Sequence, residues 1–300
     1  MTENRKCTLC PRNCKVDREE KTGFCGLGEK TVLAKVMLHK WEEPCICFGK
    51  GSGALFFSGC QLKCAFCQNY EISAEICGKE VSKEELTKLF FLLQEKGACN
   101  INLVSPTPHL NVLIPALKRA KEEGLMIPVV LNSGGYESAD TLKRLDGLID
   151  IYLPDFKFFD PSLSQKLCGA KDYAEKCMEA LKEMYRQVGK VQWDGEKLKK
   201  GLMIRHLILP GNTADSIKIL DKISDLFPKD EIVLSLMRQY TPCHKALKIP
   251  GLERKLTSLE YQKVLRRAEE IGFPFLYTQE KESASQDFIP DFSIYSLENN

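Results

Sequence analysis

Short apolar runs alternate with longer amphipathic segments along most of the chain, and this order predicts the fold. The amphipathic segments repeat apolar residues at helical spacing, whereas the short runs are typical of buried strands. Strands and helices that alternate in this way form parallel sheets covered by helices. We therefore expect an α/β fold, a partial (βα)6-type parallel barrel.

The expected strands are Leu55–Ser58, Asn100–Val104, Ile127–Leu131, Ile149–Leu153, Met203–Leu209, Ile232–Leu236 and Phe273–Tyr277. One expected helix begins after Ser82-Lys-Glu-Glu85, which has the pattern of a capping box. The others are Leu110–Glu123, Ser138–Leu145, Asp172–Val188, Thr213–Leu226 and Leu259–Ile271.

Three regions differ in composition and predict the domain organisation. Residues 1–50 form a small cysteine-rich N-terminal module with one expected strand, Thr31–Leu38. Residues 51–280 form the barrel, in which the polar stretch Lys190–Lys200 reads as an exposed connection. Residues 281–300 form a polar tail. We expect its rings to anchor it on the barrel or to cover the mouth, and they are Phe288, Pro290, Phe292 and Tyr295.

Composition narrows the function classes. The 300 residues carry a net charge of +2, which gives no basic footprint for nucleic acid. We find no apolar run of the roughly 20 residues that cross a membrane, and no secretory signal, so we expect a cytoplasmic protein. In that reducing compartment, the 14 cysteines read as metal ligands and buried thiols, with disulfides as the alternative.

The most specific chemical feature is a cysteine triplet, Cys60, Cys64 and Cys67, with the spacing C-x3-C-x2-C. Three thiolates on a short loop can hold three corners of a cubane iron–sulfur cluster and leave one iron without a protein ligand. A zinc ion completed by a remote cysteine is the alternative. The triplet directly follows the expected strand Leu55–Ser58, at the carboxyl end where active sites of parallel α/β folds lie.

Several motifs around this triplet carry a family resemblance. With Phe66 just before its last cysteine, the triplet resembles the radical S-adenosylmethionine (SAM) superfamily. Further motifs are similar to the branch related to pyruvate formate-lyase activating enzyme, and they are Cys7-Thr-Leu-Cys-Pro-Arg-Asn-Cys14, Trp41-Glu-Glu-Pro-Cys45, Phe57-Ser-Gly-Cys60, Gln68-Asn-Tyr70, Arg205-His-Leu-Ile-Leu-Pro-Gly211 and Gln239-Tyr-Thr-Pro242. These motifs extend over nearly the whole chain.

The resemblance implies a 4Fe-4S cluster on Cys60, Cys64 and Cys67, with SAM bound to the open iron. Reductive cleavage of SAM would yield a 5′-deoxyadenosyl radical that abstracts hydrogen from a substrate. The resemblance further implies a protein or peptide substrate, such as the glycine of a glycyl-radical enzyme, and an electron donor of the flavodoxin or ferredoxin type. A small-molecule substrate is the alternative within this class. A non-catalytic iron–sulfur or zinc protein, acting in electron transfer or binding, is the alternative outside it.

By the same resemblance, polar residues after later strands are candidates to contact SAM. Ser105 and Thr107 stand where family members carry a Gly-Gly-Glu stretch that meets the methionyl amine, but no carboxylate is present there. Asn132 and Ser133 resemble the turn that meets the ribose and methionyl groups. For both segments, an ordinary turn is the alternative reading.

Asp155 and Lys157 resemble the Asp-Leu-Lys of activating enzymes, and their spacing puts both side chains on one side of an extended chain. Lys157 would pair with the methionyl carboxylate, and a plain surface ion pair is the alternative. Arg205 and His206 are adjacent on a strand, so one should face the barrel interior and the other the helices. The alternative for His206 is a hydrogen-bonded core residue.

A second cysteine group lies near the N-terminus: Cys7, Cys10, Cys14 and Cys25. Four thiolates at this spacing suit a tetrahedral zinc ion or a second iron–sulfur cluster, and the residues leave both possibilities open. Cys45 and Cys47 lie between the two groups and are candidates to replace a ligand in either.

Overall fold

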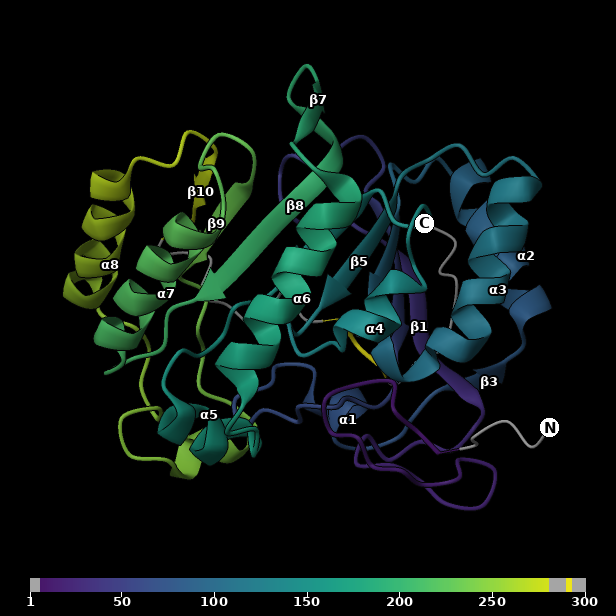
Figure 1. Cartoon of the computed structure of the whole chain (residues 1–300), viewed down its shortest axis with the longest axis horizontal. Coiled ribbons are helices and arrows are strands. Elements are labelled where there is room, and N and C mark those ends of the chain that lie inside the picture. The colour runs from purple at the N-terminus through teal and green to yellow at the C-terminus, as the bar shows by residue number, and fades with distance from the viewer. Residues whose placement is uncertain (1–5, 281–289, 293–300) are drawn as a thin grey trace.

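A computed structural model describes residues 6–280 and 290–292. These residues form one ten-stranded, curved sheet at the centre of the molecule, in the order β10-β9-β8-β6-β5-β4-β2-β1-β3 with β7 paired to β8 (Figure 1). Neighbours from β2 to β10 along this path run parallel, and these strands are β2 (Ser52–Phe57), β4 (Ile101–Val104), β5 (Val129–Ser133), β6 (Ile151–Pro154), β8 (Lys197–Leu207), β9 (Val233–Met237) and β10 (Leu276–Thr278).

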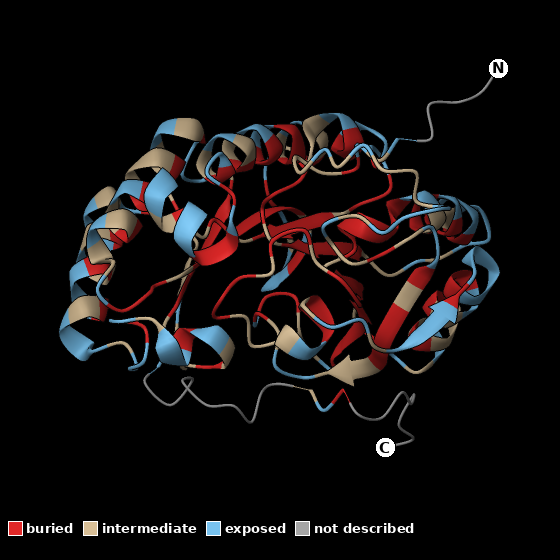
Figure 2. Ribbon diagram, turned by 90° about the horizontal axis from the view of Figure 1, so that it is seen from below, coloured by how far each residue is buried: buried red, intermediate tan, exposed pale blue. Residues whose placement is uncertain are grey.

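Helices lie on the outer side of this sheet and leave its central strands β2, β4, β5, β6 and β9 buried (Figure 2). The α-helices are α1 (Tyr70–Ser73), α2 (Lys83–Glu95), α3 (Leu110–Glu122), α4 (Ala139–Lys143), α5 (Pro161–Cys168), α6 (Tyr173–Val188), α7 (Thr213–Leu226) and α8 (Ser258–Ile271). Two short 3-10 helices, η1 (Thr107–His109) and η2 (His244–Lys248), follow β4 and β9. The predicted α/β partial barrel is confirmed.

The two ends of the sheet show why the barrel is partial. At one end, β1 (Thr31–His39) pairs antiparallel with β2 and with the short β3 (Lys79–Val81). At the other end lies β10, and within the described part of the chain β10 and β3 do not pair with each other. The sheet therefore curves around a cavity without closing.

Local sequence signals explain the elements that were expected and two that were not. Both bonds of the predicted capping box are present at α2, between Ser82 and Glu85. The stretch expected as an exposed connection is instead a β-hairpin, formed by β7 (Gln192–Asp194) and the first residues of β8. Its turn contains Asp194-Gly195, a dipeptide typical of hairpins.

Helix α5 was also missing from the prediction, although its start carries a clear signal. The Asp160 side chain accepts hydrogen bonds from the backbone N–H groups of Ser162 and Leu163, and Pro161 occupies the first turn. Gly169, with φ of 64°, ends the helix in the left-handed region. This helix matters for the site, because it carries Leu167 and Cys168 against the cysteine loop.

Part of the C-terminal tail packs on the barrel. Phe292 is buried against the ring of Phe56, with ring centroids 5.5 Å apart, and Pro290 lines the main cavity. The prediction that a tail aromatic anchors this segment is confirmed for Phe292, whereas Phe288 and Tyr295 lie outside the described residues.

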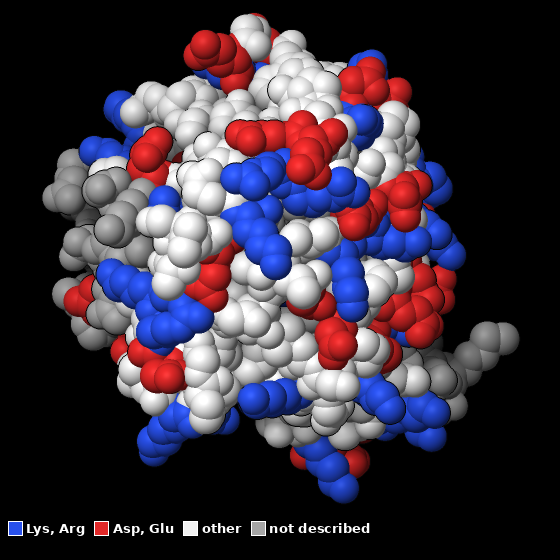
Figure 3. All heavy atoms as spheres, turned by 90° about the vertical axis from the view of Figure 1, so that its left-hand side faces the viewer, with Lys and Arg blue, Asp and Glu red and all other residues white. Residues whose placement is uncertain are grey.

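The distribution of charged side chains on the surface is consistent with the low net charge of the chain. On the face that carries α7 and α8, basic and acidic side chains intermingle (Figure 3). One of the ion pairs between these helices joins Arg267 and Asp221 at 2.8 Å. Among the described residues, the helices are all too short or too polar to cross a membrane.

Candidate active site

The main cavity lies at the carboxyl ends of the parallel strands and has a volume of about 260 Å³. Cys60, Cys64 and Cys67 all line it, on the loop that leaves β2. Two backbone bonds hold this loop: the Ala65 N–H donates to the Leu167 carbonyl at 2.8 Å, and the Ala65 carbonyl accepts from Ala246 N–H at 2.9 Å. Helices α5 and η2 therefore fix the triplet from both sides.

The environment of the three thiols favours a bound cation. Burial raises the pKa of the Cys67 thiol to about 12, although the Ser73 hydroxyl donates to its sulfur at 3.3 Å. Burial also raises the pKa of Cys60, whose sulfur accepts from the Leu62 N–H at 3.3 Å. Thiols in this setting ionise when a metal supplies positive charge. The donor set therefore fits an iron–sulfur cluster.

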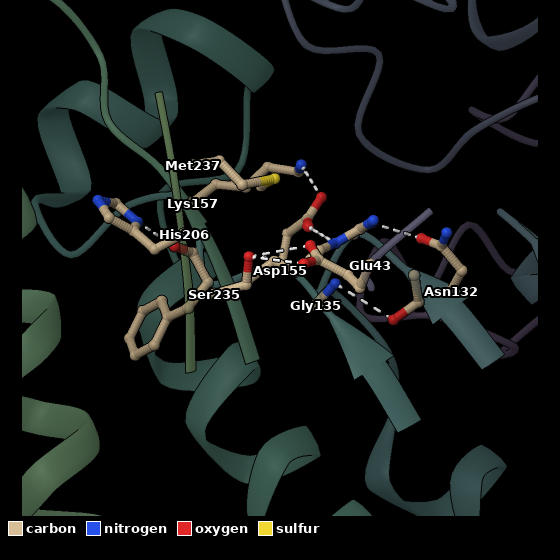
Figure 4. Close-up of polar contacts among 12 residues, drawn as sticks. Glu43, Asn132, Gly135, Asp155, Lys157, His206, Ser235 and Met237 are labelled. Atoms are coloured by element: carbon tan, nitrogen blue, oxygen red, sulfur yellow. Dashed lines mark hydrogen bonds and ion pairs between the residues drawn. The ribbon is translucent and has the colours of Figure 1, made fainter. Parts of the chain in front are cut away.

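A chain of alternating charges crosses the cavity floor. Asp155, directly after β6, accepts from Arg205 Nε at 2.9 Å on one oxygen and pairs with Lys157 Nζ through the other (Figure 4). The side chains of Asp155 and Lys157 are only 14% and 18% exposed, so this is not a surface ion pair. The predicted placement of both side chains toward one cavity is confirmed.

The charges of this pair reinforce one another. Burial by itself would raise the pKa of Asp155, but the nearby Arg205 and Lys157 cations lower it below its usual value. Burial likewise favours the neutral amine of Lys157, yet the Asp155 carboxylate raises the pKa of Lys157. Both groups are therefore ionised at neutral pH, and the ammonium offsets a small part of the rise that burial causes in the pKa of the Cys60 and Cys67 thiols.

Arg205 faces the cavity from β8, and His206 lies on the other face of the strand. Arg205 donates to the Asn132 side-chain oxygen at 2.6 Å in addition to Asp155. The His206 ring meets the Phe156 carbonyl at 2.7 Å, and burial lowers its pKa to about 4. His206 is not among the residues that line the cavity, as its alternative reading as a core residue implies.

Two residues that the sequence did not mark as site residues lie in this network, Glu42 and Glu43, between β1 and β2. Glu42 accepts from Arg205 Nη1 at 3.2 Å and from Asn102 Nδ2 at 2.8 Å. Glu43 accepts from the Ser235 hydroxyl, and burial raises the pKa of Glu43 to about 7. Both glutamates belong to the motif Trp41-Glu-Glu-Pro-Cys45, which was the available signal.

Of the other residues predicted to contact SAM, some line the cavity and one does not. Ser105 lines the cavity with φ of 57°, a left-handed conformation that non-glycine residues adopt mainly at constrained sites. Phe66 also lines the cavity and packs edge-on against Phe158, with centroids 5.9 Å apart. Thr107 does not line it, because η1 turns its hydroxyl toward Glu137.

Glu137 is a further residue that sequence reasoning missed. Its carboxylate is buried and accepts from Gln61 Nε2 at 2.9 Å, the Thr107 hydroxyl at 3.0 Å and the Ser133 hydroxyl at 2.9 Å. These bonds tie the cysteine loop to the turns after β4 and β5. Burial raises the pKa of Glu137 to about 7, against the smaller opposing effect of the two hydroxyls.

This raised pKa predicts a pH-dependent stability. Between the ordinary glutamate pKa and about 7, the folded protein binds more protons at Glu137 than the unfolded chain, so stability falls as pH rises through this window. Between pH 4.5 and pH 8, we expect the free energy of unfolding of the wild-type protein without cofactors to fall by up to about 3 kcal/mol more than that of Glu137→Gln. Urea unfolding of both proteins across this range measures the difference. Parallel curves would contradict the assignment.

Comparison with known proteins then places the chain in a family. The model of the radical SAM superfamily matches residues 55–223, more than half of the chain. The chain belongs to the radical SAM superfamily. The matched segment contains the cysteine loop, Asn132, Asp155 and Arg205, so it spans most of the cavity.

Individual proteins and one solved structure are also similar to this chain. An uncharacterised protein of Methanocaldococcus jannaschii is 32% identical over 284 residues, which are 91% of this chain and 77% of that protein. The pyruvate formate-lyase-activating enzyme of Clostridium pasteurianum is 25% identical over 195 residues, 63% of this chain and 75% of that enzyme. The crystal structure of methylornithine synthase shares the fold with a TM-score of 0.51 and 18% identity, covering 82% of this chain and 65% of that one.

A radical SAM protein uses a 4Fe-4S cluster and SAM, and the cavity suits both. Three thiols face it, and Lys157 has two N–H groups beyond the one that pairs with Asp155. Within residues 6–280 and 290–292, no three Cys, His, Asp or Glu side chains converge as ligands of one ion. A cubane binds each cysteine through a different iron, so its ligands do not need to converge on one point.

The N-terminal cysteines form a separate group beside this site. Cys7, Cys10, Cys14 and Cys25 line one small pocket, and each of the other three thiols acts electrostatically on Cys10. Arg12, between two of them, donates to the carbonyls of Gln61 at 2.8 Å and Cys168 at 2.6 Å. This pocket is therefore joined to the loop that carries the triplet.

Proposed function

We propose that this radical SAM enzyme abstracts a hydrogen atom from a protein or peptide substrate, in the manner of a glycyl-radical activating enzyme. The observation that carries the proposal is Trp41, which lines the cavity and is nevertheless 65% exposed. A large exposed aromatic that borders a cavity is typical of a protein-binding surface. The partial similarity to the activating enzyme of Clostridium pasteurianum supports the same class.

The residues of the chain would position the cofactor as follows. Lys157 donates to the methionyl carboxylate, and Asp155 keeps lone pairs free to accept from the methionyl amine. Phe66 and Tyr240 form an apolar wall of the cavity. When bound, the cluster and SAM supply the 5′-deoxyadenosyl radical that takes the hydrogen atom.

The reaction also needs an electron, and we propose a donor of the flavodoxin or ferredoxin type and a cytoplasmic location. Reduced iron–sulfur centres of this kind work at low potential, which such carriers reach. The described helices, none of which suits a membrane span, are compatible with this location.

Deuterium transfer tests the substrate class. We would grow the source organism with dideuterated glycine, prepare an anaerobic extract, and separate macromolecules from small molecules by gel filtration. The reconstituted enzyme, reduced with dithionite, is then given SAM and each fraction. We expect the macromolecular fraction to increase 5′-deoxyadenosine formation and to place deuterium in that product, as seen by mass spectrometry. Stimulation by the small-molecule fraction alone would overturn the protein-substrate proposal.

We further propose that the N-terminal cysteines hold a second iron–sulfur cluster, whose thiolates bind different irons, or a zinc ion, toward which the thiols would have to draw together because, in the described part of the chain, no three of them converge on one point. Two nitrogens of the Arg18 guanidinium, Nε and Nη2, are buried without a hydrogen-bond partner, and the side chain lines the same pocket. An anionic thiolate centre would satisfy them. Metal analysis of a variant lacking Cys60, Cys64 and Cys67 separates the two: one zinc or about four irons per chain. A variant that contains neither zinc nor iron would contradict the proposal.

A further inference from the structure

Glu42 reaches the cofactor cavity from outside the segment that defines the family. It lies between β1 and β2, before residues 55–223, yet its side chain lines the main cavity and is only 9% exposed. A carboxylate so far removed from water needs strong partners. The barrel interior supplies them from three different strands.

The hydrogen bonds of this carboxylate are complete. One oxygen accepts from Arg205 Nη1 at 3.2 Å and from the Glu43 N–H at 3.3 Å. The other accepts from Asn102 Nδ2 at 2.8 Å and from Asn132 Nδ2 at 3.2 Å. A carboxylate has about four acceptor positions, and all four are taken. Glu42 therefore acts through its neighbours and does not itself bind the cofactor.

The neighbours lead directly to the predicted cofactor contacts. Arg205 bridges Glu42 and Asp155, and Asp155 in turn pairs with Lys157. The four charges alternate in sign and cancel. Without Glu42, the guanidinium would lose one of its two ion-pair partners and would be free to draw Asp155 away from Lys157.

We propose that Glu42 is a positioning residue for SAM. It fixes Arg205, and through Arg205 it holds the Asp155–Lys157 pair in the geometry that receives the methionyl amine and carboxylate. The chain lacks the Gly-Gly-Glu carboxylate that would follow β4. In its place, Asp155 would accept from the methionyl amine, and Glu42 would hold Asp155 in position. The inference rests on SAM binding by Asp155 and Lys157, and it is independent of the substrate class.

The first test is Glu42→Gln, which keeps the shape of the side chain. Its amide N–H₂ would face the donor groups of Asn102 and Asn132, and the negative charge opposite Arg205 is lost. We expect the Kd for SAM to rise about tenfold or more, as for other residues that orient a ligand-binding group. Equilibrium dialysis on protein with full iron content measures it, and the change that SAM causes in the EPR spectrum of the reduced cluster should weaken in parallel.

A rescue variant separates positioning from general stability. In Glu42→Gln/Asn102→Asp, the amide of residue 42 meets a carboxylate instead of a donor, and the lost charge returns to the network. We expect this double variant to recover most of the lost SAM affinity. Asn102→Asp alone places two carboxylates together and should not improve binding.

Two results would overturn the inference. One is a Glu42→Gln protein that binds SAM with wild-type Kd while its melting temperature falls. The other is a double variant that recovers the melting temperature but not the SAM affinity. Neither assay contains a protein substrate, so a failure of the proposed substrate class leaves these results unaffected.

Discussion

Replacing Cys64 by alanine is expected to abolish 5′-deoxyadenosine formation and to lower bound iron after anaerobic reconstitution. Cys64 is the middle cysteine of the triplet and lies buried in the cavity wall. If the three cysteines are the protein ligands, as predicted, a cluster that loses one of them has too few thiolates to stay bound through a catalytic cycle. Iron and sulfide analysis, the ultraviolet–visible spectrum and chromatographic detection of 5′-deoxyadenosine measure the effect together.

The neighbouring thiols provide the controls. Cys243 is buried near the same loop, 3.5 Å from the Phe66 carbonyl, but does not line the cavity, so Cys243→Ala should keep its iron and its activity. Cys168 lies beside Cys64 and hydrogen-bonds with it. It is therefore the thiol placed to substitute for Cys64, and Cys64→Ala/Cys168→Ala removes that route. Product from this double variant would show that Cys64 is not a cluster ligand.

The parts of the site that the sequence predicted are those fixed by local geometry. The spacing of the triplet and its place after an apolar run were enough to put three thiols at one cavity. The family resemblance singled out Asp155 and Lys157, and alternation along an extended chain placed both on one side. The same rule placed Arg205 and His206 on opposite faces of β8. In a regular strand the direction of a side chain can be predicted from the sequence, because each residue faces one of only two sides of the sheet.

The parts that were missed depend on contacts between distant segments. Glu42 and Glu137 stand in irregular segments, where no periodicity says which way a side chain points. Most of their partners are more than 20 residues away in the chain, as with Asn102 and Gln61. The expected cofactor contact of Thr107 is replaced by its bond to Glu137 for the same reason, since η1 has no strand-like alternation. In the sequence, the only sign of such networks is an acidic residue shortly before a predicted strand or helix.

The second large effect concerns the stability of this network: Arg205→Met is expected to lower the free energy of unfolding by about 3–5 kcal/mol. The change leaves the buried carboxylates of Glu42 and Asp155 without their shared cation, and it also frees the Asn132 oxygen. Methionine replaces most of the side-chain volume, so the loss is mainly electrostatic. Urea unfolding of protein without cofactors measures it.

Arg267→Met is the matched control for this loss, because Arg267 pairs with Asp221 on the surface, with both side chains about two-fifths exposed. An exposed pair contributes about 0–1 kcal/mol, so the two arginines should differ several-fold. Lower pH should reduce the difference between the two variants in lost free energy of unfolding. In Arg205→Met the cation that lowers the pKa of Asp155 is lost, so the pKa of Asp155 rises and its uncompensated charge disappears on protonation as pH falls. An equal loss for both arginines, or a gap that widens in acid, would mean that Arg205 does not neutralise these two carboxylates.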